Sequence, residues 1–254
     1  MTPAPRPTPG AGSIGIDVDL DDIWLFPSSD FLSALEEEDR HALFDMAWRK
    51  SFKKGMCIFE AGDEASMLYI METGRAKIYQ TSPSGKDIIL WFCFPGETFG
   101  LAELSRGVKR SISARAMGDS QVLCLPKSDF LRFIAERPSV ALSAIDILST
   151  RLRRLGQTFM NLATEDVPLR IVRLILGLAY GSAHGKCAEH EDDGTICVNI
   201  TLTHQEIADM IGATRQTVTT ALNDLKRAGI IRWVDHHIHI ERPDALKHII
   251  GAGA

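Results

Sequence analysis

Hydrophobic residues between about Lys54 and Leu125 fall in short runs that are separated by glycines. The runs are CIF at 57, LYIM at 68, AKIYQ at 76, DIILWFCF at 87, SISARA at 111 and QVLCL at 121. Glycines recur every 11 residues, at Gly74, Gly85, Gly96, Gly107 and Gly118, which is the turn spacing of an antiparallel sandwich or barrel. The pattern predicts a jelly-roll-like β-barrel.

The segments that flank the barrel have helical patterns. SSDFLSALEEEDRHALFDMAW before it predicts an amphipathic helix that Ser29 or Asp30 could cap. After it, hydrophobic residues lie alternately four and three positions apart, which is the seam of a two-stranded coiled coil. We therefore expect a homodimer; the alternative is a helix that packs on its own barrel, which usually shows a wider apolar stripe. The predicted dimer interface consists of Ile145, Leu148, Leu152, Leu155, Phe159 and Leu162.

The segment LTHQEIADMIGATRQTVTTALNDLKRAGIIRWV predicts two short helices joined by a glycine turn, a helix-turn-helix. Thr203 and Glu206 have the spacing of a capping box, and Gly212 would end this first helix. Thr214 can cap the second helix, and Gly229 would stop it. The following residues, IIRWV and HIHIE, predict a β-hairpin, so the unit has a wing.

The second helix has the side chains of a recognition helix, whose N-terminal residues meet base edges in the major groove. Arg215 suits guanine, Gln216 suits adenine, and threonine methyl groups suit thymine. Basic residues also outnumber acidic ones here, although the whole chain carries a net charge of −5. The alternative is a protein-interaction module whose polar side chains are merely solvated. The predicted DNA-binding residues are Thr203, Thr214, Arg215, Gln216, Thr217, Thr219, Thr220 and Lys226.

Composition and length refine this interpretation. The chain has 254 residues, of which 45% are hydrophobic, so two folded parts are expected. Five scattered cysteines suit a reducing cytosol, and no run approaches the roughly 18 apolar residues of a membrane span, so we expect a cytoplasmic protein that contacts no membrane. The expected α+β organisation is a disordered proline-rich tail (1–22), an N-terminal jelly-roll barrel domain (23–137), a dimerisation helix (138–165) and a C-terminal winged helix-turn-helix (166–254).

The sequence argues against an enzyme. Metalloenzymes built on jelly-roll barrels need several histidines or carboxylates inside the barrel, yet His41 is the only histidine before position 184. Motifs for phosphate loops, dinucleotide binding and nucleophile elbows are absent. The loop residues His184, Cys187, His190 and Cys197 do not match the spacing of a zinc finger, so no metal site is expected.

The order of barrel, long helix and winged helix-turn-helix resembles the Crp/Fnr family of bacterial transcription regulators. The resemblance covers about Phe31 to Leu246. The motifs that carry it are KKGMCIFEAGDEASMLYIMETGRAKIYQ, the FG…RS segment, Asp166 and HQEIADMIGATRQTV. It implies a cyclic-nucleotide-binding type of barrel, double-stranded DNA with a partly palindromic operator as partner, and RNA polymerase as a further partner. It also implies a ligand that shifts the population between DNA-competent and incompetent dimers.

The FG…RS segment is the family's phosphate-binding cassette, and it departs from the family pattern here. Arg110 and Ser111 match the anion-binding pair, but Leu101 stands where cyclic-nucleotide binders have a glutamate, and Glu103 lies two residues farther on. Leu155 and Gly156 replace the Thr-Ser pair that meets the base. The candidate effector residues are Phe99, Gly100, Leu101, Ala102, Arg110 and Ser111.

Four hypotheses for the effector stay open. The first is a cyclic nucleotide or dinucleotide, and the second is another small anion, as in the 2-oxoglutarate-responsive NtcA type. The third is haem or redox sensing, as in the CooA type, which Cys93 matches although Pro95 stands in the place of the histidine ligand. In the fourth, Arg110 pairs with a glutamate of the fold and no effector binds.

Overall fold

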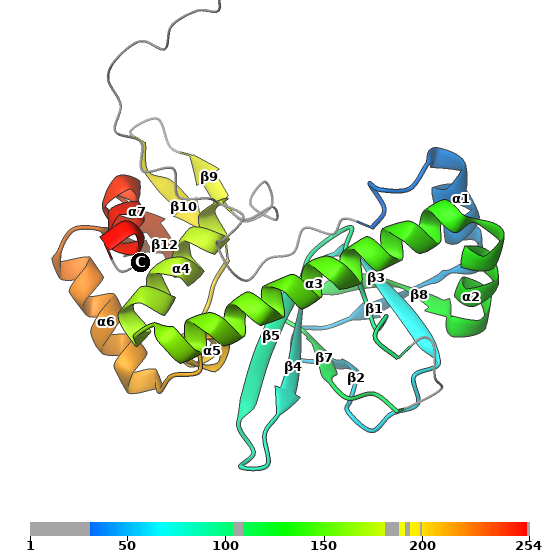
Figure 1. The fold of residues 1–254 in the computed structure, drawn as a ribbon, viewed down its shortest axis with the longest axis horizontal. Coiled ribbons are helices and arrows are strands. Elements are labelled where there is room, and N and C mark those ends of the chain that lie inside the picture. The colour runs from blue at the N-terminus through cyan, green and yellow to red at the C-terminus, as the bar shows by residue number, and fades with distance from the viewer. Residues whose placement is uncertain (1–30, 104–108, 181–187, 191–193, 199, 253–254) are drawn as a thin grey trace, which may run out of the picture.

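The computed structural model describes residues 31–103, 109–180, 188–190, 194–198 and 200–252. It shows a β-barrel and a smaller helical domain, with one long helix running beside both (Figure 1). The predicted tail (1–22) and the two candidate caps, Ser29 and Asp30, lie outside the described residues. None of the described helices is long and apolar enough to cross a bilayer.

The barrel consists of two antiparallel four-stranded sheets, as the glycine spacing predicted. One sheet has the strand order β1-β8-β3-β6 and the other β2-β7-β4-β5. Their bounds are β1 (Trp48–Phe52), β2 (Cys57–Phe59), β3 (Met67–Thr73), β4 (Ala76–Thr81), β5 (Asp87–Cys93), β6 (Thr98–Phe99), β7 (Ser113–Ala116) and β8 (Ser120–Pro126). Inside the barrel, Phe59, Tyr69 and Phe99 stack on one another with ring centroids 5.3–6.1 Å apart.

The helix before the barrel is shorter than the sequence pattern predicted. Helix α1 spans Glu37–Met46, whereas Phe31 and Leu35 lie in turns and are buried in the core between the barrel and its helices. The helix begins where acidic residues cluster, because carboxylates in a first turn interact favourably with the helix dipole. Its N-cap residue is Glu36, whose side chain makes no capping hydrogen bond.

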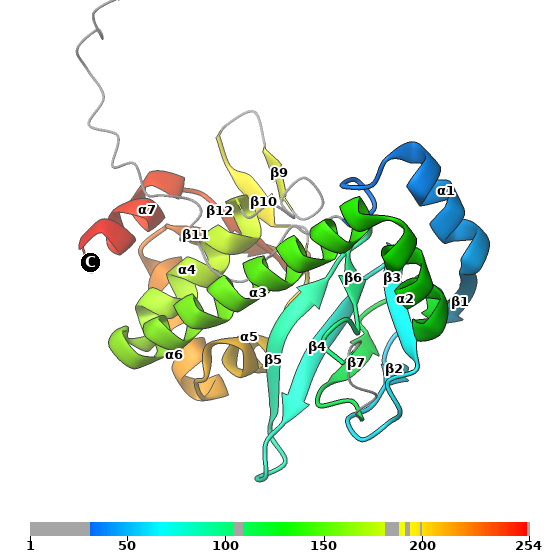
Figure 2. The same cartoon turned by 45° about the vertical axis from the view of Figure 1, so that its right-hand side comes forward.

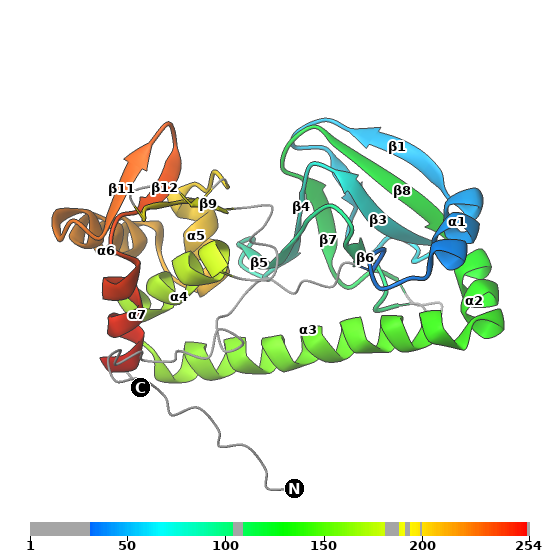
Figure 3. The same ribbon diagram turned by 90° about the horizontal axis from the view of Figure 1, so that it is seen from above.

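Two helices follow the barrel, α2 (Lys127–Glu136) and α3 (Pro138–Thr164). Pro138 separates them, because proline disfavours helical geometry in the preceding residue yet fits the first turn of the next helix. One face of α3 packs on the barrel side through Val140, Ala144 and Ile147, while its predicted seam is exposed. Figure 3 shows α3 along one side of the molecule, from the barrel to the C-terminal domain.

The C-terminal domain surrounds a buried helix, α4 (Val167–Tyr180). The remaining elements are β9 (Ala188–His190), β10 (Ile196–Val198), α5 (His204–Ile211), α6 (Arg215–Arg227), β11 (Ile231–Val234), β12 (His237–Ile240) and α7 (Pro243–Ala252). The four strands form a third antiparallel sheet in the order β11-β12-β10-β9. The chain thus has the α+β class and the domain types that its pattern predicted.

The two domains share a hydrophobic core. Tyr79, Ile89, Phe92 and Phe94, from β4 and β5 and the residue just after β5, are buried in the same cluster as the C-terminal helices. Figure 2 shows β5 beside α5. The Lys86 ammonium group, at the turn between β4 and β5, donates a hydrogen bond of 2.9 Å to the Ala213 carbonyl. The barrel therefore fixes the position of the helix-turn-helix.

Two glycines at turns of the barrel provide a test of its packing. Gly74 and Gly85 both have a φ of +80°, but a Cβ at Gly74 would lie 2.3 Å from the Ser120 hydroxyl oxygen and 2.6 Å from the Asp119 carbonyl, whereas nothing lies within 4 Å at Gly85. We predict that both alanine variants lose stability through the positive φ, and that Gly74→Ala loses a further 1–3 kcal/mol or so through overpacking. Thermal unfolding of the two variants measures the difference; equal losses would contradict it.

Candidate nucleic-acid interface and barrel site

Local hydrogen bonds fix the first helix of the helix-turn-helix. The Thr203 hydroxyl accepts a hydrogen bond of 3.1 Å from the Glu206 amide, and the Glu206 carboxylate accepts one of 2.8 Å from the Thr203 amide. This is the capping box that the spacing predicted. Gly212 ends the helix with a φ of +64°, a conformation that glycine adopts without steric cost. These interactions therefore fix both the start of α5 and the turn that follows it.

Helix α6 presents the polar side chains that the sequence predicted for DNA. The Thr214 hydroxyl caps its start by accepting a hydrogen bond of 3.1 Å from the Thr217 amide. Val218, Ala221 and Leu222 are buried. The predicted DNA-binding residues Thr214, Arg215, Gln216, Thr217, Thr220 and Lys226 are all exposed. The start of the helix therefore offers side-chain donors and acceptors together with the positive end of the helix dipole.

Two other predicted DNA-binding residues are already engaged within the domain. Thr203 belongs to the capping box. Thr219 is only partly exposed: its hydroxyl donates to the Arg215 carbonyl at 2.8 Å and lies 2.8 Å from His204 Nδ1. His204, whose ring lies 5.9 Å from that of Trp233 in β11, joins both helices to the wing. Sequence reasoning missed His204, because nothing in its spacing indicates this contact.

The wing is a tight hairpin. Asp235 and His236 have φ angles of 47° and 68°, as the two central residues of a type I′ turn require. The other basic residue near Lys226, Arg227, forms an ion pair with Asp224 on the same helix. Lys226 is thus better placed than Arg227 to meet a phosphate.

In the barrel, the structure brings Gly100 and Glu103 within hydrogen-bond distance of Arg110. The guanidinium group is 1% exposed and lies over the Phe59 ring, 4.4 Å from its centroid. Arg110 Nη1 donates hydrogen bonds to the Gly100 carbonyl (2.9 Å) and to Glu103 Oε2 (3.1 Å), and Nη2 donates to the Met67 carbonyl. A Cβ on Gly100 would lie only 2.9 Å from Nη1, so this close approach needs glycine.

Other cassette residues point elsewhere. The Leu101 side chain is buried in the core formed with α1, α2 and α3 rather than in the interior of the barrel. Ala102 is exposed. The Glu103 carboxylate also accepts hydrogen bonds from the Ser111 hydroxyl (2.9 Å) and amide (3.3 Å). Arg110 thus pairs with a glutamate of the fold, as the fourth hypothesis for the effector supposes.

Comparisons with known proteins agree with this architecture. Residues 49–137 match the family model of the cyclic nucleotide-binding domain, and residues 169–249 match that of the Crp-like helix-turn-helix domain. The chain is 31% identical over 197 residues to the CRP-like cAMP-activated global transcriptional regulator of Mycobacterium tuberculosis, covering 77% of this chain and 84% of the relative. It belongs to the Crp/Fnr family of transcription regulators.

One further relative and one solved structure are also similar to this chain. The global nitrogen regulator of Synechococcus elongatus is 30% identical over 202 residues, which cover 78% of this chain and 87% of the relative. The structure of a CooA mutant from Carboxydothermus hydrogenoformans superposes with a TM-score of 0.72 at 22% identity, covering 90% and 99% of the two chains. Its similarity concerns the fold alone.

Among the described residues of this Crp/Fnr protein, the candidates for haem or redox sensing do not converge. Cys93 is fully buried in the barrel core, where its thiol lies 3.6 Å from the Glu97 carbonyl. His41 lies on α1 with its side chain 75% exposed. Burial raises the pKa of the Cys57 thiol to about 11, so this thiol stays protonated and weakly reactive at neutral pH.

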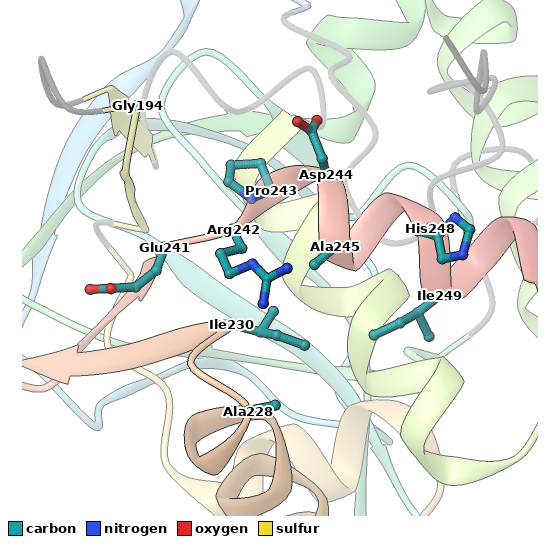
Figure 4. A pocket seen from close by; sticks show the side chains of 10 residues that line it. All are labelled: Gly194, Ala228, Ile230, Glu241, Arg242, Pro243, Asp244, Ala245, His248 and Ile249. Carbon is teal, nitrogen blue, oxygen red and sulfur yellow. The ribbon is translucent and has the colours of Figure 1, made fainter. Parts of the chain in front are cut away.

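A surface pocket of about 830 Å³ lies in the C-terminal domain. Figure 4 shows Arg242 extending toward Ile230 within it. Its lining residues are Gly194, Ala228, Ile230, Glu241, Arg242, Pro243, Asp244, Ala245, His248 and Ile249. These come from the residues before β10, the connection between α6 and β11, the connection between β12 and α7, and α7 itself. This pocket is therefore not the effector site predicted in the barrel.

The two neighbouring threonines of α6 provide a matched test of the His204 contact. We predict that Thr219→Val destabilises the C-terminal domain by about 1 kcal/mol, because His204 loses its hydroxyl partner. Thr220→Val, with the same side-chain shape at an exposed position, should change stability by less than about 0.5 kcal/mol. Thermal unfolding of both variants measures the difference in stability. Equal losses would show that the contact between Thr219 and His204 does not stabilise the domain.

Proposed function

We propose that this protein is a homodimeric, sequence-specific regulator that binds a partly palindromic operator through α6. The observation that carries the proposal is the exposed N-terminal face of α6, where Arg215 and Gln216 stand clear of the domain. Arginine can pair bidentately with guanine, and glutamine with adenine. Thr217 and Thr220 complete the face toward bases, and Lys226 meets the DNA backbone.

The seam of α3 supports the homodimer. Its exposed fractions are Ile145 58%, Leu148 40%, Leu152 72%, Leu155 43%, Phe159 70% and Leu162 42%. Contiguous apolar surface of this kind typically marks a protein interaction site, and the heptad spacing fits a second copy of the same helix. A two-fold axis along α3 would place two recognition helices on half-sites about 34 Å apart.

The remaining assignments follow from this arrangement. We propose that residues 23–137 form the regulatory domain, 138–165 the dimerisation helix and 166–254 the DNA-binding domain, which agrees with the bounds of α3. A regulator of this kind acts at promoters, so RNA polymerase is its expected protein partner. Its expected location is the bacterial cytoplasm. The relative from Mycobacterium tuberculosis, a global transcriptional regulator by name, supports this inference.

The role of Arg215 is tested on DNA. Arg215→Ala should lose about 1–3 kcal/mol of binding free energy on an operator selected from random sequences, and little on random DNA, because a base contact is removed. Fluorescence anisotropy measures both affinities. Lys226→Ala is the control: it should weaken binding to both DNAs equally and reduce the salt slope by about 1 for each half-site, which is about 2 for the dimer. Equal losses on both DNAs for Arg215→Ala would refute base reading by this residue.

The dimer is tested at Leu152. Leu152→Asp should raise the dimer dissociation constant at least about tenfold, because each dimer would bury two carboxylates where it had buried two leucines. Leu131→Asp on α2 is the matched control, since Leu131 is also exposed (38%) but lies outside the seam. Sedimentation equilibrium of the two variants and the parent protein gives the masses. A Leu152→Asp protein that remains as dimeric as the control would disprove the seam.

A further inference from the structure

The anion-binding pair of the cassette already holds a carboxylate. Arg110 Nη1 lies 3.1 Å from Glu103 Oε2, and the Ser111 hydroxyl and amide donate to Glu103 Oε1 at 2.9 and 3.3 Å. Each carboxylate oxygen therefore has its own donors. A guanidinium, a hydroxyl and a backbone amide that converge in this way are the donors that bind an oxygen of a phosphate or carboxylate ligand.

We propose that Glu103 is an internal, covalently tethered ligand of the Arg110–Ser111 site. It keeps the cassette in its occupied arrangement, so a free phosphate or carboxylate compound binds only after displacing it. Gating of this regulator by a free anion, one of the hypotheses from the sequence, is therefore blocked in the native chain. Glu103, a residue of the cassette itself, therefore decides which anions the site can bind.

The burial of the pair supports this role. The side chains of Arg110 and Glu103 are 1% and 5% exposed, and a buried charge needs a partner of opposite sign. If a free anion took the place of the Glu103 carboxylate, this carboxylate would either lie beside the anion, which has the same charge, or move into water. The tether also gives Glu103 a local concentration on the order of millimolar or higher, so a dilute metabolite competes poorly.

The rest of the site is adapted to the filled state. The Arg110 guanidinium rests on Phe59 and Tyr69, 4.4 and 5.8 Å from their ring centroids, and Gly100 leaves room for it. The Glu103 backbone is itself fixed, because the Lys127 ammonium group at the start of α2 donates a hydrogen bond of 3.1 Å to the Glu103 carbonyl. Hydrogen bonds thus hold both the carboxylate and the backbone carbonyl of Glu103 in place.

The test is an anion rescue of the full-length protein. Melting temperatures are measured in chloride and, at matched ionic strength, in inorganic phosphate, acetate or cyclic AMP. The native protein should gain only the small, nonspecific stabilisation that phosphate gives folded proteins in general. Glu103→Ala should melt at a lower temperature and regain several degrees in phosphate or acetate, because the anion fills the vacated site.

Two controls identify the site of the rescue. The double variant Glu103→Ala, Arg110→Gln should not respond, because the guanidinium is gone. Glu72→Ala removes the carboxylate of a more exposed Arg–Glu pair with Arg49 and should respond to the anions no more than the native protein does. If Glu103→Ala does not fold, Glu103→Gln keeps the shape without the charge and should show a smaller rescue.

Two outcomes would overturn the proposal. One is a native protein that phosphate, acetate or cyclic AMP stabilises as much as Glu103→Ala, and the other is a folded Glu103 variant with Arg110 intact that no anion stabilises. Neither outcome depends on DNA. Binding of the native protein to its selected operator in chloride tests the proposed function separately, so the two proposals can fail independently.

Discussion

The hydrophobic contact between the barrel and the C-terminal domain is the constraint on which the arrangement of this molecule depends. Aromatic and aliphatic side chains around β4 and β5, among them Phe92 and Phe94, are buried together with α4 and α5. Lys86 adds a hydrogen bond to the turn just before the recognition helix. Because apolar burial is the dominant favourable term in folding, this shared core stabilises one position of the helix-turn-helix relative to the barrel.

Two buried guanidinium groups connect this contact to the cassette and to α3. Arg151 of α3 donates a hydrogen bond to the Thr98 carbonyl and lies over the Trp91 ring, while Arg110 donates to the Gly100 carbonyl. Burial lowers the pKa of Arg151. The short segment from Thr98 to Gly100 is thus held by Arg151 of α3 and by Arg110, which precedes β7. These contacts join the cassette to the long helix.

The elements with strong local signals were predictable from the sequence, and the contacts between distant residues were not. The capping box at Thr203 and the glycine turn at Gly212 are encoded by adjacent residues, and the structure has both. The start of α1 was predicted too early: residues 31–35 form turns and a bend, and the helix begins only at Glu37. The engagement of Thr219 by His204 depends on the packing of two helices, and the pairing of Arg110 with Glu103 depends on how the cassette folds. Residue spacing alone predicts the geometry of neither contact.

The exposed seam of α3 has a consequence for how such a regulator responds over time. In the proposed dimer, the amount of paired chain at low abundance rises with the square of total chain concentration, by mass action. A cassette filled by its own carboxylate removes one chemical input, so synthesis and proteolysis of the chain become the variables that set operator occupancy. Pairing of two protomers would cover the large apolar side chains that a lone protomer leaves in water, such as Leu152 and Phe159. Operator occupancy would then follow the concentration of the chain itself.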